Sequence, residues 1–455
     1  ELGGGGATNP GPLPGFLANP CATGDLWWIN PCNEDFDLAK KGSRHVFSDV
    51  AQSTAFDDGK AFVPYCLVYF NHDTYQTEVA SDAVARINKT MKKVERLSPR
   101  DAETLGWIWE AFERRWMIPS FQVLLNPPWP INEPDPLEEC YEDPDYPLDP
   151  RWGIMPFGEL LEELFESVHM RCAVHRVQQS ASGTFADECD GHFLTVLAVG
   201  FSLGFFPYAM WEGGTHTTIH AIQRAFSEYG GEFFTHSEVD KILIENGKAV
   251  GVKLVDGTEV RARRMVVTDV DMFQIFTRFL RDYPVPRMLM NKVKIFKYDR
   301  HNLFWGQLAF KERPHYIASQ FDPDLEEHVA LTLSMVPADW EYVKSGKYKE
   351  ERLGVRPGKW PTKPVFWENT LSWQDPHYAP PGYHTSLLEE YGPPASWLTD
   401  KEWVQLKHEA TWYFQKAWQK YAPNMTPENI LGGDITTPWD TVRRNINMRE
   451  GCWCV

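Results

Sequence analysis

The chain has 455 residues, 43% hydrophobic and 24% charged, an ordinary composition for a protein of two or three domains. Its net charge of -18 argues against nucleic acid or an anionic lipid surface as an electrostatic partner. Eight cysteines lie scattered, with no C-x-x-C pair and no Cys/His spacing typical of zinc, which indicates reduced thiols in a cytoplasmic protein.

The N-terminal end carries a glycine run at positions 3–6, followed by Thr8 and by Pro14-Gly15-Phe16. Glycine lets the backbone approach a ligand closely, because no Cβ stands in the way. The alternative is a disordered tail, which is common at chain ends. Residues 45–50 and 61–70 then read as β-strands.

Two helices are predicted next. Residues 81–97 are predicted to form a polar helix. A second helix begins at Pro99, with Ser98 as its cap and Asp101 three residues after the cap. The apolar face of the second helix is predicted to face a core rather than a ligand. It comprises Ala102, Leu105, Ile108, Trp109, Phe112 and Trp116.

The middle of the chain alternates irregular and apolar stretches. Residues 119–149 are rich in Pro, Glu and Asp and read as a long surface loop or lid, and 157–170 as one amphipathic helix. Residues 193–210 carry no charge over 18 positions, just enough for a membrane span. Pro207, two glycines and acidic flanks favour a buried helix instead.

Residues 211–271 hold the sharpest pattern. Gly213-Gly214 opens a helix that Thr215 caps, and Gly230-Gly231 closes it. Ile219, Ile222 and Phe226 mark the apolar stripe of this helix. A short strand at 232–234 and three more strands follow, joined by turns at Asn246-Gly247 and Asp256-Gly257, with Val260, Val266 and Val267 in the last strand. Taken alone, this is a generic α/β piece.

The C-terminal third is predicted to add strands at 302–308 and 328–335 and one long helix. Thr399 and Glu402 form a capping box, and Leu398 with Trp403 forms a hydrophobic staple. The buried stripe of this helix comprises Trp403, Leu406, Ala410, Phe414 and Ala417.

The stretch from 211 to 271 resembles the second FAD-contacting segment of the phytoene desaturase and carotenoid isomerase family, within the amine oxidase superfamily. Residues 238–242 match its E-V-x-x-I strand. The following pattern is matched by Gly247, Gly251-Val252, Asp256-Gly257, Ala262 and Val266-Val267. The family places a Pro soon after the paired valines, whereas this chain continues with Thr268-Asp269.

The resemblance implies an α/β fold of two domains. One is a Rossmann-like FAD-binding domain, and the other is a substrate domain with a mixed sheet and helices. Residues 1–40, 206–271 and 439–455 are assigned to the FAD-binding domain, and 41–205 and 272–438 to the substrate domain. The resemblance also implies FAD contacts from Gly3, Gly4, Thr8, Gly213, Gly214 and Val239. It further implies that residues 21–25 form a wall of the active site.

Two family segments have no counterpart in the sequence: the N-terminal G-x-G-x-x-G turn and the last FAD segment. Glycine backbone and a helix N-terminus neutralise the FAD pyrophosphate in such turns. We therefore expect the functional protein to contain polypeptide before Glu1 and after Val455, on the same product or on a companion chain.

No catalytic constellation stands out, and a flavin dehydrogenase needs little acid–base apparatus from its protein. His216 and His220 lie four apart on one helix, but zinc sites need three or four ligands, so a structural role is preferred and no metal is predicted. Three hypotheses remain. They are an FAD-dependent dehydrogenase or desaturase of an apolar, isoprenoid or cyclic substrate, a flavin-dependent C=C isomerase, and a flavin-free scaffold protein. Peripheral membrane association is compatible with all three.

Overall fold

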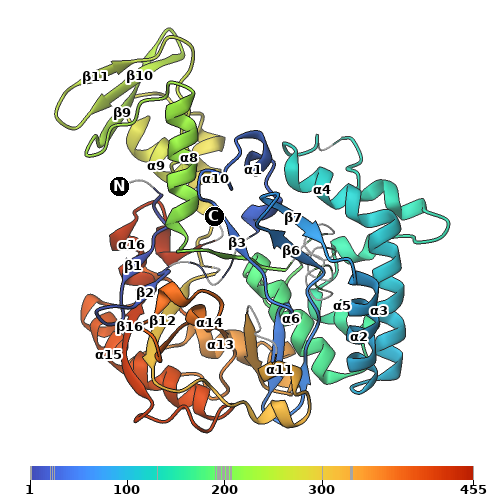
Figure 1. The fold of residues 1–455 in the computed structure, drawn as a ribbon. Coiled ribbons are helices and arrows are strands. Elements are labelled where there is room, and N and C mark those ends of the chain that lie inside the picture. The colour runs from blue at the N-terminus through green and yellow to red at the C-terminus, as the bar shows by residue number, and fades with distance from the viewer. Residues whose placement is uncertain are drawn as a thin grey trace.

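The computed structural model describes residues 3–453 apart from 21, 23, 25, 131, 190, 192–195, 197–199, 201–203, 205–206, 300 and 328–331. A seven-stranded mixed sheet forms its centre, in the order β16-β12-β15-β14-β13-β4-β5 (Figure 1). Neighbours are antiparallel except β13 and β4, which run parallel. The strands are β4 (Ser53–Phe56), β5 (Ala61–Phe62), β12 (Leu303–Phe310), β13 (Leu333–Val336), β14 (Phe366–Asn369), β15 (His384–Tyr391) and β16 (Ile430–Thr436).

One face of this sheet packs on the long helix α15 (Asp400–Gln419). The predicted capping box is present, since Thr399 accepts the Glu402 N–H and the Glu402 carboxylate accepts the Thr399 N–H. The predicted stripe is buried against alternate residues of β12, β14 and β15. Burial of such side chains stabilises the fold by roughly 1.5–3 kcal/mol each. The core on this side includes Phe304, Leu308, Phe366, Leu388, Trp403, Leu406, Ala410 and Phe414.

The other face looks toward a helical lobe made of α2 (Ala83–Glu95), α3 (Pro99–Ala111), η2 (Phe112–Trp116), α4 (Met117–Leu125), α5 (Phe157–Leu164) and α6 (Val168–Ser182). Ser98 caps α3 as predicted, because its Oγ accepts the Asp101 N–H at 3.1 Å. The apolar face of α3 and η2 lies in the lobe's core. The prediction that this apolar face packs in a core is therefore confirmed.

The single helix predicted over 157–170 is wrong, since two helices occupy that region. The Asp101 carboxylate accepts the backbone N–H groups of Glu166 and Ser167, at 2.8 and 2.9 Å. A turn at 165–167 presents both N–H groups to this buried acid, which ends α5 and starts α6. The loop predicted over 119–149 is wrong in part, because α4 extends to Leu125 and η3 covers Glu138–Glu142. Pro119 lies just after the π-helical turn η2, within a helical run that continues from α3 without a break.

Helix α8 (His216–Glu228) and a three-stranded meander, β9 (Val239–Glu245), β10 (Lys248–Leu254) and β11 (Glu259–Arg261), project from the body at the top of Figure 1. Both predicted turns join these strands, and Asn246 and Gly247 have positive φ. Residues 266–267 lie beyond β11, and 232–234 form no strand. Both expectations are therefore wrong: a strand needs a partner, and the described residues place none beside either segment.

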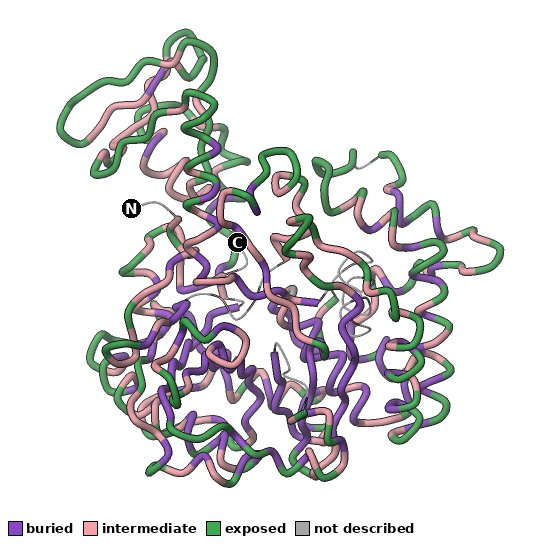
Figure 2. The backbone as a smooth tube through the Cα atoms, viewed as in Figure 1, coloured by how far each residue is buried: buried purple, intermediate pink, exposed green. Residues whose placement is uncertain are grey.

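The stripe predicted on α8 is also only partly buried. Thr218, Ala221 and Ala225 face the interior, whereas Ile222 and Phe226 are 37% and 48% exposed. Figure 2 shows this upper part of the molecule mostly exposed, in contrast to the buried strands of the central sheet. Ala221 and Ala225 pack against Leu38, Trp27 and Cys32.

The remaining elements are short connections. The strands are β1 (Asn9–Pro10) with β2 (Leu17–Ala18), β3 (His45–Val46) with β8 (Met210–Trp211), and β6 (Val68–Asn71) with β7 (Gln76–Val79). The helices are η1 (Trp27–Ile29), α1 (Cys32–Asp35), η4 (Pro150–Gly153), α9 (Met272–Gln274), η5 (Ile275–Phe279), α10 (Arg287–Ile295), η6 (Ile317–Gln320), α11 (Asp324–Glu327), α12 (Trp340–Lys344), α13 (Lys347–Leu353), α14 (Leu371–Gln374), η7 (Pro376–Tyr378), η8 (Ala395–Trp397), α16 (Pro438–Arg444) and η9 (Arg449–Gly451).

Most of the uncharged stretch 193–210 and part of the strand predicted over 328–335 lie outside the described residues. Among the helices that are described, none has the length and apolar character needed to span a bilayer.

Buried histidines give the fold a pH-dependent stability. Burial lowers the pKa of His175 to about 3, with the charge of Arg176 adding to the effect, and lowers the pKa of His301 to about 3 and of His45 to about 4. Below pH 6.5 the unfolded chain binds protons that the folded chain cannot, so stability falls as pH falls. We expect each group to remove about 2 kcal/mol between pH 7 and pH 5. Denaturant unfolding of His175→Gln at both pH values checks this, and an unchanged pH dependence would contradict it.

Candidate functional site

The N-terminal glycines fold against helix α8. The Gly6 N–H donates to the Gly3 carbonyl at 2.7 Å, and a Cβ on Gly3 would come within 2.9 Å of the Ile219 side chain. Gly3 and Gly4 have φ of +91° and +46°, a backbone region that glycine adopts readily. The sequence alternative of a disordered tail is therefore wrong for residues 3–6, which form a turn packed on a helix.

Thr8 joins this segment to the start of α8. Its Oγ1 donates to Asn19 Oδ1 at 3.0 Å and lies 3.2 Å from Thr215 Oγ1. Thr215 precedes α8 as predicted, but its hydroxyl donates to the Ala7 carbonyl instead of capping the helix. The capping acceptors come from the N-terminal segment instead: the His216 N–H donates to Thr8 Oγ1 and the Thr215 N–H to Asn19 Oδ1, each at 3.4 Å.

The pair Gly213-Gly214 forms the other side of this junction. Gly214 has φ of +111°, and a Cβ there would lie 2.3 Å from Thr8 Oγ1. The Gly213 N–H donates to Asp375 Oδ2 at 2.6 Å. Glycine at 214 is therefore required so that Thr8 can approach the helix start.

A cavity of about 1030 Å³ opens beside the glycine turn. Both ends of the described chain line it, since a Cβ on Gly5 would lie 3.6 Å from the Trp453 ring. Its wall combines glycine backbone, flat indole rings and one cation, Arg444. The lining residues include the glycines at 3–6, Ala22, Trp27, Trp211, Thr215, Ile219, Asp269, Arg444, Asn447 and Trp453.

A second hollow, of about 390 Å³, lies at the base of the meander. Val239 and Ile242 of β9 line it together with Val266 and Val267. Asp269 and Asn447 belong to the walls of both hollows. The two hollows therefore adjoin across this shared wall, one beside the glycine turn and the other beside the first residue of β9.

The structure thus brings Gly3, Gly4 and Val239 to two adjoining hollows. Thr8, Gly213 and Gly214 lie at the junction behind the first one, where they hold its wall. Of the wall predicted at 21–25, Ala22 lines the cavity, whereas Cys21, Thr23 and Asp25 lie outside the described residues.

Sequence reasoning missed three buried residues of this junction. Asn19 bridges Thr8 and Tyr378, donating to the Tyr378 hydroxyl at 2.9 Å, and Asp375 holds Gly213. Burial raises the pKa of Tyr378, so its hydroxyl stays protonated. The only sequence signal near them is Asp375-Pro376, where Asp375 caps η7, and it says nothing of contacts 162 residues away.

The His216 and His220 rings lie 4.4 Å apart, edge to face. Over the described residues, no group of three or more His, Cys, Asp or Glu side chains could hold a metal ion.

Sequence comparison finds proteins that resemble this chain. The chain is 23% identical over 345 residues to one of the subunits of limonene dehydrogenase from Castellaniella defragrans, a match that covers 71% of this chain and 56% of that protein. Over 71 residues it is 38% identical to a neurosporene-forming phytoene desaturase of Rhodobacter capsulatus, covering 15% and 13%. The chain is thus similar in sequence to phytoene desaturase-like FAD oxidoreductases.

Further likeness is found over 84 residues, at 27% identity, to the chloroplastic prolycopene isomerase of Daucus carota, covering 18% of this chain and 14% of that protein. The chain spans little more than half the length of the limonene dehydrogenase polypeptide and smaller shares of the others. No protein-family model matches the sequence.

Comparison with solved structures bears on the fold. The solved structure of an oxidoreductase from Methanosarcina mazei superposes with a TM-score of 0.54 at 14% identity, covering 93% of this chain and 77% of that one. The predicted α/β class, with a mixed sheet and helices, is confirmed.

Proposed function

We propose that this chain forms part of an FAD-dependent oxidoreductase that dehydrogenates or desaturates an apolar, isoprenoid or cyclic substrate. The observation that carries the proposal is the pair of adjoining hollows, one beside the glycine turn and the other beside Val239. FAD is a long molecule with two aromatic ends, and one compact pocket would not hold it.

The residues present fit such a cofactor. Glycine at 3–6 exposes backbone without a Cβ, Trp27, Trp211 and Trp453 offer flat apolar walls, and Arg444 supplies a positive charge. The backbone of Val239 would hold the adenine. The first N–H groups of α8 are already bonded to Thr8 and Gly214, so this helix start is not the pyrophosphate site.

Bound FAD supplies the hydride acceptor, at N5 of its ring system. The role of this chain is to position a substrate carbon and to exclude water. The indole walls serve both purposes, because they are flat and largely apolar, with Trp211 buried and Trp27 and Trp453 half-buried. The names of the relatives, limonene dehydrogenase and phytoene desaturase, support a substrate with little polar surface.

The likeness to prolycopene isomerase favours one second candidate, a flavin-dependent C=C isomerase without net redox change. Anaerobic addition of substrate separates the two: a dehydrogenase bleaches the visible flavin bands stoichiometrically, and an isomerase leaves the bands unchanged at the end of turnover. A preparation that never binds FAD would instead support the flavin-free scaffold.

Replacing Val239 tests the adenine contact. Val239 begins an edge strand, where proline is tolerated, so Val239→Pro removes one N–H with limited damage to the meander. We expect flavin content to fall at least tenfold, measured from visible absorbance after desalting. Val239→Ala keeps the N–H and serves as the control. Equal flavin content in the two variants would contradict the contact.

The domain assignment is part of the same proposal. Residues 1–40, 206–271 and 439–455 are assigned to the FAD-binding domain, and residues 41–205 and 272–438 to the substrate domain.

We also propose that further polypeptide completes the FAD site. The exposed apolar side chains of α8 and of the segments flanking the meander support this, with Ile222, Phe226, Phe234 and Val267 at 37%, 48%, 77% and 81% exposure. We further propose that the protein is cytoplasmic and contacts membranes only peripherally, if at all.

A further inference from the structure

The α6-facing side of the central sheet is unlike its α15-facing side. Three residues lie in a row across adjacent strands: Trp305 of β12 and Trp367 of β14 are each directly opposite Glu389 of β15. All three are at least 96% buried. Cross-strand neighbours such as these have Cβ atoms about 5 Å apart, so their side chains form one group.

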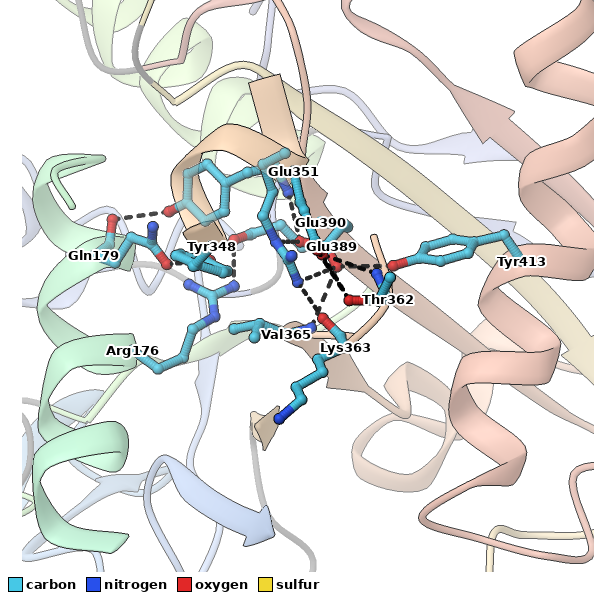
Figure 3. A network of polar contacts seen from close by, with 12 residues as sticks. Arg176, Gln179, Tyr348, Glu351, Thr362, Lys363, Val365, Glu389, Glu390 and Tyr413 are labelled. Carbon is cyan, nitrogen blue, oxygen red and sulfur yellow. Dashed lines mark hydrogen bonds and ion pairs between the residues drawn. The ribbon is translucent and has the colours of Figure 1, made fainter. Parts of the chain in front are cut away.

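Arg176 of α6 reaches toward Glu389, the middle residue of this row (Figure 3). Its Nη2 donates to Glu389 Oε1 at 3.0 Å, and its guanidinium lies 4.5 Å from the Trp367 ring centre and 5.3 Å from that of Tyr391. Arg176 is fully buried. Within the described part of the chain, its Nε and Nη1 have no hydrogen-bond partner, nor do the indole nitrogens of Trp305 and Trp367.

A second buried arginine, Arg352, differs from Arg176 in its hydrogen bonding. Arg352 donates to both Glu390 oxygens, to the Tyr342 hydroxyl and to the Lys363 carbonyl, so its donors are occupied. Glu390 and Glu389 are consecutive on β15 and point to opposite faces of the sheet. Other groups of the protein accept hydrogen bonds from Nε, Nη1 and Nη2 of Arg352. By contrast, Nε and Nη1 of Arg176 have no acceptor among the described residues.

The chemistry of the unpaired atoms defines what they can bind. All four are N–H donors, and a buried donor without an acceptor costs about 1–3 kcal/mol. The Glu389 carboxylate lies beside Arg176, so a further anion would meet that negative charge in a poorly solvated site. An uncharged oxygen acceptor with a flat apolar body fits best.

The row also lies close to the cavity. The Trp305 ring packs edge-on against Trp453, with centroids 5.1 Å apart, and Trp453 lines the cavity beside the glycine turn. The Trp367 ring packs in the same manner on Tyr208, at 5.5 Å. A molecule held by the row would therefore lie one aromatic ring away from the cavity.

We propose that Arg176, Trp305 and Trp367 bind the carbonyl oxygen of an uncharged cyclic ketone or enone, making this the polar end of the substrate site. The inference rests on the proposed function for its position beside the FAD cavity. It refines the substrate from a pure hydrocarbon to a carbonyl compound with a flat hydrocarbon body. Arg176 acts here as a binding residue that recognises the oxygen.

Binding of carvone and limonene tests this, because the two share a skeleton and differ by the carbonyl group. Calorimetric titration of the full chain, with and without FAD, should give at least tenfold tighter binding of carvone. Arg176→Lys, which keeps a cation beside Glu389, and Trp367→Phe, which keeps the ring, should each reduce that preference at least threefold. Infrared spectra of bound carvone should show the carbonyl stretch at higher frequency in Arg176→Lys than in the native chain.

Trp360→Phe is the matched control, since the Trp360 indole N–H already donates to Glu409 at 3.0 Å, away from this row. It should leave the carvone preference unchanged. Equal binding of the two ligands by the native chain would overturn the proposal, as would a carvone preference that neither variant reduces. Loss of flavin with the preference intact would count against the proposed function and leave this inference standing.

Discussion

Arg352→Met is expected to destabilise the fold by about 3–5 kcal/mol, the cost of leaving one partner of a buried ion pair alone. Arg352 and Glu390 are both fully buried, and Arg352 Nε donates to Glu390 Oε1 at 3.1 Å. Burial raises the pKa of Glu390 even beside its partner, and Arg352 opposes that rise. Without the guanidinium, the carboxyl group must either take up a proton or remain charged in the core. Guanidinium unfolding monitored by circular dichroism measures the loss.

The control is the double variant Arg352→Met with Glu390→Leu, which removes both charges and keeps the volume. Replacing a whole buried pair by apolar side chains is often close to neutral. We therefore expect the double variant to recover most of the loss, although the Tyr413 hydroxyl and the Val365 N–H also lose an acceptor. A single variant within about 1 kcal/mol of the native chain would show that the pair is not what holds α13 to β15.

Gly214→Ala is expected to have the second large effect, on stability and on flavin affinity together. The new Cβ would lie 2.3 Å from Thr8 Oγ1 and 2.9 Å from Thr8 Cβ, so rotating the Thr8 side chain does not relieve the clash. The positive φ adds strain of about 1–2 kcal/mol. Thr8 must then leave the α8 junction, which opens the wall of the cavity. We expect at least a tenfold weaker FAD affinity and a loss of about 3 kcal/mol or more.

Gly230→Ala is the control that separates the backbone strain of a positive φ from the steric clash with Thr8. Gly230 follows the other end of the same helix with φ of +79°, and a Cβ there would meet nothing within 4 Å. It should cost only the strain of about 1–2 kcal/mol and leave FAD affinity unchanged. Equal effects of the two substitutions would contradict a specific requirement for close approach at Gly214.

Local signals predicted the elements well where the chemistry is local. Thr399 with Glu402, Ser98 with Pro99, and the Asn246-Gly247 turn all act within a few residues, and each is found as expected. The failures come from contacts between distant segments. The break between α5 and α6 depends on Asp101, 65 residues away from Glu166, and no periodicity reveals that acid's role.

The candidate site shows the same division. Gly3, Gly4 and Val239 carry recognisable patterns, and the structure places them at two adjoining hollows. Asn19, Asp375 and Arg444 reach the site only through the tertiary fold. The polar row on the sheet could not be read from sequence, because Trp305, Trp367 and Glu389 acquire a common face only when β12, β14 and β15 pair in their observed register.

Hydrogen-exchange mass spectrometry with and without FAD tests the central claim most directly, namely that the adjoining hollows hold the cofactor. It should be done on the protein as it exists natively, with any companion polypeptide present. FAD is expected to slow exchange in peptides covering residues 3–8, 239–245 and 266–270, and to leave α2 and α3 in the distant helical lobe unchanged. Binding of FAD with no protection at 3–8 and 239–245, or with protection confined to other peptides, would contradict the account.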